Sequence, residues 1–147
     1  MKNHEFYMRE ALNEAEKSIA SGSYPFACVV VDNGGEIVCR EHDRVDEYTD
    51  PTAHGEINAI RHLCKKLNIK NLSGFTFYTT SEPCPTCLSS LLKAKVNVVV
   101  FGTETEADAS LPISAFELAE RSTREIEIIG GILREECLKQ RTKFFNK

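Results

Sequence analysis

The segment FTFYTTSEPCPTCLSSLLKAKVNVVVFG, from Phe75 to Gly102, is the stretch that decides the fold. FTFYTT and VNVVVFG are short runs rich in aromatic and β-branched residues, and each is predicted to form a strand. Between them, the residues from Pro85 to about Ala94 are predicted to form a helix, because proline suits the first helical position. The segment therefore predicts a strand–helix–strand unit with Cys84 and Cys87 at the start of its helix.

Further elements are predicted on both sides of this unit. Apolar residues at helical spacing predict an amphipathic helix from about His4 to Ser21. It is followed by a strand in YPFACVVVD, a turn at NGG, a strand in EIVCRE, a polar loop in HDRVDEYTD and a helix in DPTAHGEINAIRHLCKKL. After the central unit come a helix in PISAFELAERS, a strand in EIEII and a helix in ILREECLKQRTKFF. This order predicts an α/β fold, in which a mixed sheet has one antiparallel hairpin, then parallel crossovers, and helices on both faces.

The composition is that of an ordinary globular protein. Of the 147 residues, 41% are hydrophobic and 27% are charged, and the formal net charge is −4. We expect one domain, residues 1–147. The apolar runs are too short to cross a bilayer and the charged N-terminal sequence does not resemble a signal peptide, so we expect a cytoplasmic location and no membrane partner. Because nucleic-acid-binding proteins usually carry a basic face, the acidic balance favours a small-molecule substrate and makes a nucleic-acid partner less expected.

The spacing of the six cysteines separates one pair from the rest. Four are scattered among apolar residues: Cys28, Cys39, Cys64 and Cys137. These four are expected to be buried and reduced. Cys84 and Cys87 form a Cys-x-x-Cys pair, which alone is compatible with a redox couple, half of a structural zinc site, or part of a catalytic metal centre. The helix dipole lowers thiol pKa values at a helix start, so both are expected to favour the thiolate.

A second motif, DPTAHGE, lies thirty residues earlier. Asp50 or Thr52 is expected to cap the following helix, with Pro51 in its first turn, which puts His54 near the start of that helix. Glu56 follows two residues later, and side chains at positions i and i+2 of a regular helix point apart. His54 and Glu56 are therefore not expected to be equal ligands of one metal, although both can approach a site at the first turn.

Together the two motifs supply three metal ligands. His54, Cys84 and Cys87 are soft-to-borderline donors, and the sequence offers no fourth. Three protein ligands with an open position are typical of a catalytic zinc site, whereas structural sites usually have four. Water would occupy the open position, and Glu56 would act on it as the general acid/base.

These residues resemble the motifs of a known enzyme superfamily. His54-Gly55-Glu56 and the run Pro83–Cys87 look like those of the cytidine/cytosine deaminases, and they are most similar to the branch of guanine deaminases and tRNA adenosine deaminases. Gly55, where this branch usually has alanine, is more like the fungal cytosine deaminases. The resemblance extends over essentially the whole chain. It implies a three-layer α-β-α sandwich with a five-stranded mixed sheet in the order 2-1-3-4-5, one Zn²⁺ per chain, and a homodimer.

The resemblance also implies a reaction and roles for several residues. A ring amino group is replaced by a carbonyl and ammonia leaves, with Glu56 transferring the proton. The backbone carbonyl of Glu82 would receive the departing amine, and the backbone N–H of Gly55 would fix a ring oxygen. Phe26 would line the base pocket, as in guanine deaminases, although core packing explains it equally well.

Four further residues are candidate substrate contacts. Relatives in this branch generally carry an asparagine at the end of the second strand, where this chain has Asp43 unless the register slips. An ionised aspartate offers acceptors only, so it favours a free base with an N–H to donate over an adenosine in tRNA. Phe144 and Phe145 would fold over the active site or pack in the core, and Asp108 would contact substrate or be a solvated loop acid.

Three hypotheses about function follow. The leading one is a zinc-dependent hydrolytic deaminase of a free nucleobase or related amino-heterocycle, with guanine ahead of cytosine. The alternative is a tRNA-specific adenosine deaminase that converts the wobble adenosine to inosine. The third is a non-catalytic zinc-binding domain of the same fold, which would leave Glu56 without a role.

Overall fold

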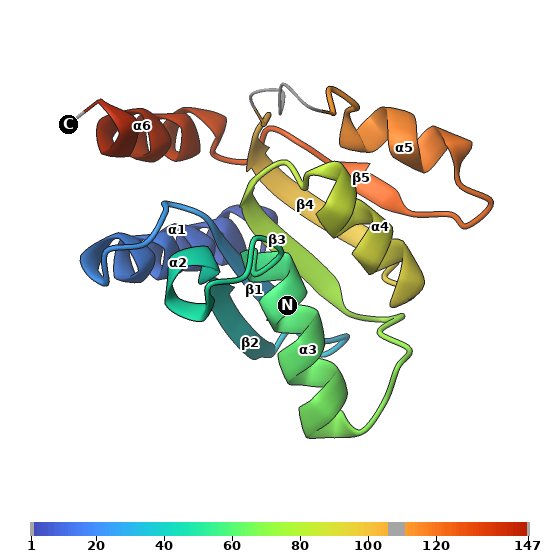
Figure 1. The fold of residues 1–147 in the computed structure, drawn as a ribbon. Helices are drawn as coiled ribbons and strands as arrows, with labels where there is room; N and C mark the ends of the chain where they lie inside the picture. Colours follow the sequence, from blue (N-terminus) through green and yellow to red (C-terminus); the bar gives the residue numbers. More distant parts are fainter. Residues whose placement is uncertain (1, 106–110, 147) are drawn as a thin grey trace.

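The centre of the computed structural model, which describes residues 2–105 and 111–146, is one five-stranded sheet with the order β2-β1-β3-β4-β5 (Figure 1). Its strands are β1 (Ala27–Val31), β2 (Ile37–His42), β3 (Thr76–Ser81), β4 (Val98–Thr103) and β5 (Glu127–Ile129). The predicted order is confirmed. Strands β3, β4 and β5 are parallel, whereas β1 is antiparallel to both β2 and β3. The antiparallel contact between β1 and β3 was not predicted, because the sequence pattern indicates only that β1 and β2 form a hairpin.

Helices cover both faces of the sheet, so the three-layer sandwich is confirmed. They are α1 (His4–Ala20), α2 (Val45–Tyr48), α3 (Gly55–Leu67), α4 (Pro85–Lys93), α5 (Ala115–Arg121) and α6 (Arg134–Phe145). Helices α1 and α6 pack on one face, and α3, α4 and α5 pack on the other, with α3 and α4 side by side in Figure 1. The short helix α2 lies in a segment that was predicted to be a loop. No helix in the described part of the chain is long and apolar enough to cross a membrane.

Two apolar clusters, one on each face of the sheet, form the core. Side chains alternate across a strand, so Val29 and Val31 of β1 belong to the cluster under α1 and α6. Cys28 and Val30 belong to the cluster under α3 and α4. All five residues of β1 are buried, which is why its sequence is continuously apolar. The expected burial of the scattered cysteines is confirmed for three of them, whereas Cys64 is half-buried.

Gly102 of β4 is the position where α6 comes closest to the sheet. A Cβ atom there would overlap the Cys137 sulfur and would lie 2.8 Å from the Thr80 carbonyl oxygen. Only a residue without a side chain allows α6 to dock at this depth.

We therefore expect Gly102→Ala to lower the free energy of unfolding by about 1–3 kcal/mol, because the extra methyl group overpacks the contact between α6 and β4. Denaturant unfolding measures this change. Gly34→Ala in the exposed hairpin turn is the control, since its Cβ would meet only Asp32 Oδ1, at 3.4 Å. Equal stability of the two variants would contradict the close approach.

Candidate active site

Three predicted metal ligands lie together at the N-terminal ends of α3 and α4. His54 Nδ1 lies 3.3 Å from Cys87 Sγ and 3.6 Å from Cys84 Sγ. The three ligand atoms all lie within 4.8 Å of one another. In a zinc tetrahedron, nitrogen and sulfur ligands are separated by roughly 3.5 Å, given Zn–N and Zn–S bonds of about 2.0 and 2.3 Å. The donor set and its spacing therefore fit Zn²⁺.

The start of α3 differs from the prediction. Asp50 Oδ1 accepts hydrogen bonds from the Thr52 N–H and hydroxyl, at 2.8 and 2.7 Å, so it closes a turn before the helix and does not cap it. The helix begins at Gly55, and His54 occupies the N-cap position with extended backbone angles. Because His54 precedes the first helical residue, the rule that side chains two positions apart in a helix point in different directions does not apply to it. His54 and Glu56 can therefore both approach one site.

The start of α4 agrees with the prediction. Cys84 is the N-cap residue, Pro85 is the first helical residue and Cys87 is the third. The Leu88 N–H donates to the Cys84 carbonyl at 2.9 Å, which closes the first turn and holds the two sulfurs on the same side. Proline is tolerated there because the first N–H of a helix has no partner within it.

The two thiols, both expected to favour the thiolate, share one hydrogen bond in this structure. A hydrogen bond from the Cys87 thiol, with a further one from His54, lowers the pKa of Cys84 to about 4. The same bond to Cys84 and burial raise the pKa of Cys87 far above its ordinary value. The pKa of His54 is raised to about 9, mainly by its hydrogen bond with Cys84. Metal binding must therefore displace protons from Cys87 and His54.

Glu56 lies beside this cluster in a buried position. Its side chain lines the same cavity as His54 and Cys84. Burial raises the pKa of Glu56 to about 7, while the nearby positive charge of His54 acts in the opposite direction. A carboxylic acid with a pKa near neutrality can both take and return a proton, which is what a general acid/base requires.

A cavity of about 360 Å³ opens next to these groups, large enough for a small aromatic ligand. Four of the predicted substrate contacts line it: Phe26, Asp43, Glu82 and Phe145. Gly55 and Phe144 do not belong to its described lining. A Cβ atom at Gly55 would meet Cys28 Cβ and N at 3.4 Å, and Phe144 packs edge-on against Phe145. The predicted role of the Gly55 N–H stays a prediction. Asp108 lies outside the described residues.

Several lining residues were missed by the sequence reading: Tyr24, Ala27, Val45, Pro51, Thr79, Thr80, Ser81 and Thr105. The sequence does hold a signal for the end of β3 as part of the cavity wall, because Thr79–Ser81 leads directly to the metal-binding cysteines. The sequence holds no such signal for Tyr24, since its ring lies at the cavity by stacking on Phe145, with ring centroids 6.3 Å apart. That contact joins residues from opposite ends of the chain.

The Asp43 side chain is almost fully buried at the wall of the cavity, with an exposure of 4%. Its Oδ1 accepts a hydrogen bond from the Val45 N–H at 3.1 Å, and its own N–H donates to the Phe26 carbonyl at 3.0 Å. Burial raises the pKa of this carboxyl, opposed by the Val45 hydrogen bond and by His54.

Glu82 has a role that the sequence did not indicate. Its N–H donates to the Thr103 carbonyl at 2.8 Å, and its side-chain Oε2 accepts from the Ala115 N–H at 2.8 Å. The buried carboxylate therefore ties the loop before the cysteines to the start of α5. The carbonyl of Glu82, which was the predicted acceptor for the departing amine, stays a prediction.

Comparisons with known proteins agree with this geometry. A family model for the cytidine and deoxycytidylate deaminase zinc-binding region matches residues 1–103. The chain is 35% identical to a tRNA-specific adenosine deaminase of Bacillus subtilis (strain 168), over 100% of this chain and 91% of that protein. It is 36% identical to a guanine deaminase of the same organism, over 69% of this chain and 65% of that protein.

A solved structure from work on A-to-I editing by tRNA:A34 deaminases matches with a TM-score of 0.82 and 27% identity, over 92% of this chain and 98% of that chain. The family model covers most of the chain, including both metal-binding motifs, and the solved structure shares its fold. The chain therefore belongs to the cytidine and deoxycytidylate deaminase family and is a zinc-dependent deaminase of nucleobases or nucleosides.

Proposed function

We propose that this protein hydrolyses the exocyclic amino group of a nucleobase held in the cavity, with Glu56 as the catalytic acid/base. The observation that carries the proposal is a buried carboxylic acid with a pKa of about 7 beside three metal ligands. When bound to His54, Cys84 and Cys87, zinc supplies a Lewis acid that activates water. Glu56 accepts a proton from the attacking water and returns it to the leaving amino group.

The first candidate substrate is adenosine in a tRNA. The supporting observation is that a relative of that activity is similar to this chain along its full length, including α6. The sequence reading had placed a free nucleobase first, and the comparisons favour the alternative. Arg141 of α6 donates to the hydroxyl of Ser81 at 3.1 Å, so one cation contacts a residue of the cavity lining.

The second candidate is a free base such as guanine. It is favoured by Asp43, a carboxylate in the cavity wall, and by the similarity to a guanine deaminase.

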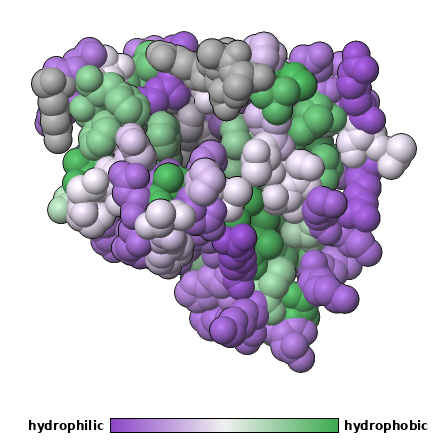
Figure 2. Space-filling model, viewed as in Figure 1, coloured by the Kyte–Doolittle hydropathy of each residue, from purple (hydrophilic) through white to green (hydrophobic). Residues whose placement is uncertain are grey.

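The distribution of charged side chains on the surface gives limited support to a polynucleotide as the substrate. Figure 2 shows hydrophilic side chains gathered at the C-terminal end of α3, where Lys65 and Lys66 are exposed. That end lies about 20 Å from His54 along the helix. The homodimer and the cytoplasmic location stay predictions.

Removal of a ligand tests the metal site. We expect Cys87→Ala to lose most of its bound zinc and to unfold at a lower temperature, because metal binding stabilises the folded state. Elemental analysis and thermal unfolding measure the two effects. Cys64→Ala is the matched control, since Cys64 is a half-buried free cysteine that does not belong to the ligand cluster. Full zinc content in Cys87→Ala would rule out the ligand assignment.

Glu56→Gln tests the catalytic role. We expect turnover to fall by about 10²–10⁴-fold while zinc content stays unchanged, because the amide cannot take up a proton. Ammonia release and elemental analysis on the same samples separate the two properties. The exposed Glu47→Gln serves as control. Activity that survives in Glu56→Gln would show that another group transfers the proton.

A substrate panel decides between the two candidates. Zinc-loaded protein is incubated with a tRNA anticodon stem-loop that carries adenosine at the wobble position, and separately with guanine, cytosine and adenine. The first candidate predicts inosine in the RNA, and the second predicts ammonia from a free base. If no compound reacts although zinc is bound, the proposed deaminase function is wrong.

A further inference from the structure

A buried amide in α3 lies close to the metal ligands and takes no part in the proposed chemistry. Asn58 is in the second turn of α3, and only 6% of its surface is exposed. Asparagine is a weak helix former, and an amide that is buried without hydrogen bonds costs free energy. The presence of Asn58 inside the helix therefore depends on the bonds that its side chain makes.

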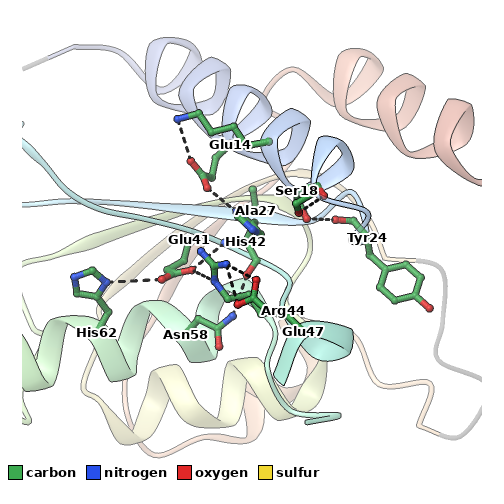
Figure 3. A network of polar contacts seen from close by, with 12 residues as sticks. Glu14, Ser18, Tyr24, Ala27, Glu41, His42, Arg44, Glu47, Asn58 and His62 are labelled. Carbon is green, nitrogen blue, oxygen red and sulfur yellow. Dashed lines mark hydrogen bonds and ion pairs between the residues drawn. The ribbon is translucent and has the colours of Figure 1, made fainter. Parts of the chain in front are cut away.

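The Asn58 amide bonds to two different segments of the chain. Nδ2 donates to the carbonyl of Ala53 at 3.1 Å and to the carbonyl of His42 at 2.9 Å. Ala53 directly precedes the metal ligand His54, and His42 is the last residue of β2. Figure 3 shows the Asn58 side chain directed from α3 towards His42. One side chain therefore joins α3, the end of β2 and the segment that carries the ligand.

The backbone of His54 needs such contacts because this residue precedes the first helical residue. The peptide group before it is held through the Ala53 carbonyl, which accepts from Asn58 Nδ2 and also from the Arg44 N–H, at 2.9 Å. The peptide group after it is held through the His54 carbonyl, which accepts from the Asn58 N–H at 2.9 Å. The second bond is a helical backbone bond that any residue except proline would make, whereas the first needs the asparagine side chain. Together they fix the direction in which the His54 side chain leaves the backbone.

The end of β2 is a firm attachment point for this bridge. His42 lies opposite Ala27 of β1 in the register of the sheet. Its side chain is anchored as well, because Nδ1 lies 2.7 Å from Glu14 Oε2 of α1 (Figure 3). Asn58 therefore connects the backbone of the histidine ligand to the sheet and to α1, and not to α3 alone.

The cysteine ligands are attached to the sheet in a different way. Strand β3 ends at Ser81, just before the cysteine motif, and the Glu82 N–H donates to the Thr103 carbonyl of β4 at 2.8 Å. His54 instead follows α2 and a separate turn, so no strand leads directly into it. The Asn58 side chain supplies for the histidine the attachment that the backbone supplies for the cysteines.

We propose that Asn58 is a positioning residue of the metal centre: its amide holds the peptide group before His54 so that Nδ1 of this ligand faces the two cysteine sulfurs, 3.3 and 3.6 Å away. The inference rests on the proposed function, because it concerns the same metal ligands. Without the amide, the histidine would adopt other orientations, and metal binding would have to order it again. Removal of a group that orients a metal ligand typically weakens metal binding by about 10–100-fold.

Two variants of Asn58 and one matched control test the proposal. Asn58→Leu removes both donors and keeps a side chain of nearly the same shape, and Asn58→Ala avoids any overlap from the added methyl groups. Gln140→Met is the control, because Gln140 Nε2 also donates to two groups, the Leu12 carbonyl and Glu16 Oε1, both at 3.0 Å. Those bonds join α6 to α1, on the face of the sheet opposite α3 and α4. Competition with a chelator measures zinc affinity, and the visible absorption of Co²⁺ bound in place of zinc reports the geometry of the ligands.

We expect both Asn58 variants to bind zinc about tenfold or more weakly and to give an altered Co²⁺ spectrum, whereas Gln140→Met matches the wild-type protein in both. Circular dichroism of the metal-free proteins establishes whether each variant is folded. Three results would overturn the inference: wild-type metal binding in the Asn58 variants, an equal loss in Gln140→Met, or loss of the fold in both Asn58 variants, since the amide would then support the fold and not the ligand. None of them bears on the deaminase proposal, which fails if the zinc-loaded wild-type protein deaminates no nucleobase, nucleoside or anticodon stem-loop.

Discussion

The contact of His54 Nδ1 with the sulfurs of Cys84 and Cys87 is the interaction on which the rest of the site depends. It joins residues thirty positions apart, and it exists because α3 and α4 pack side by side on one face of the sheet with their N-terminal ends together. Both helices begin with the ligand at the N-cap position. The two helix starts therefore bring three donors within bonding range of one metal ion.

The same arrangement defines the cavity and its chemistry. Glu56, in the first turn of α3, is buried beside the ligands, and burial raises its pKa towards neutrality. Asp43, which also lines the cavity, lies between the end of β2 and the start of α2 and accepts a hydrogen bond from the Val45 N–H. Two of the carboxyl groups that line the cavity thus have different environments: Glu56 lies next to the metal cluster, and Asp43 is bonded to a backbone N–H. Such a difference in environment allows two acids in one site to have two roles.

The similarity to relatives indicates the type of reaction, whereas the choice of substrate depends on the residues of the cavity. Similarity over the whole chain assigns the family and the type of reaction. Substrate choice depends on a few side chains at the cavity wall, and a single donor or acceptor there changes which molecules bind. Asp43 is one of the side chains that line the cavity wall.

The sequence by itself determined the order of strands and helices, the ligand set His54, Cys84 and Cys87, and the position of α4, because these depend on local spacing and on proline at a helix start. It did not determine the start of α3, where Asp50 closes a separate turn. The short helix α2 was also missed, since its four residues have no apolar periodicity. Only the tertiary structure decided which residues line the cavity. Phe145 lines the cavity and Phe144 does not, because the direction of each ring is set by packing between elements that are distant in sequence.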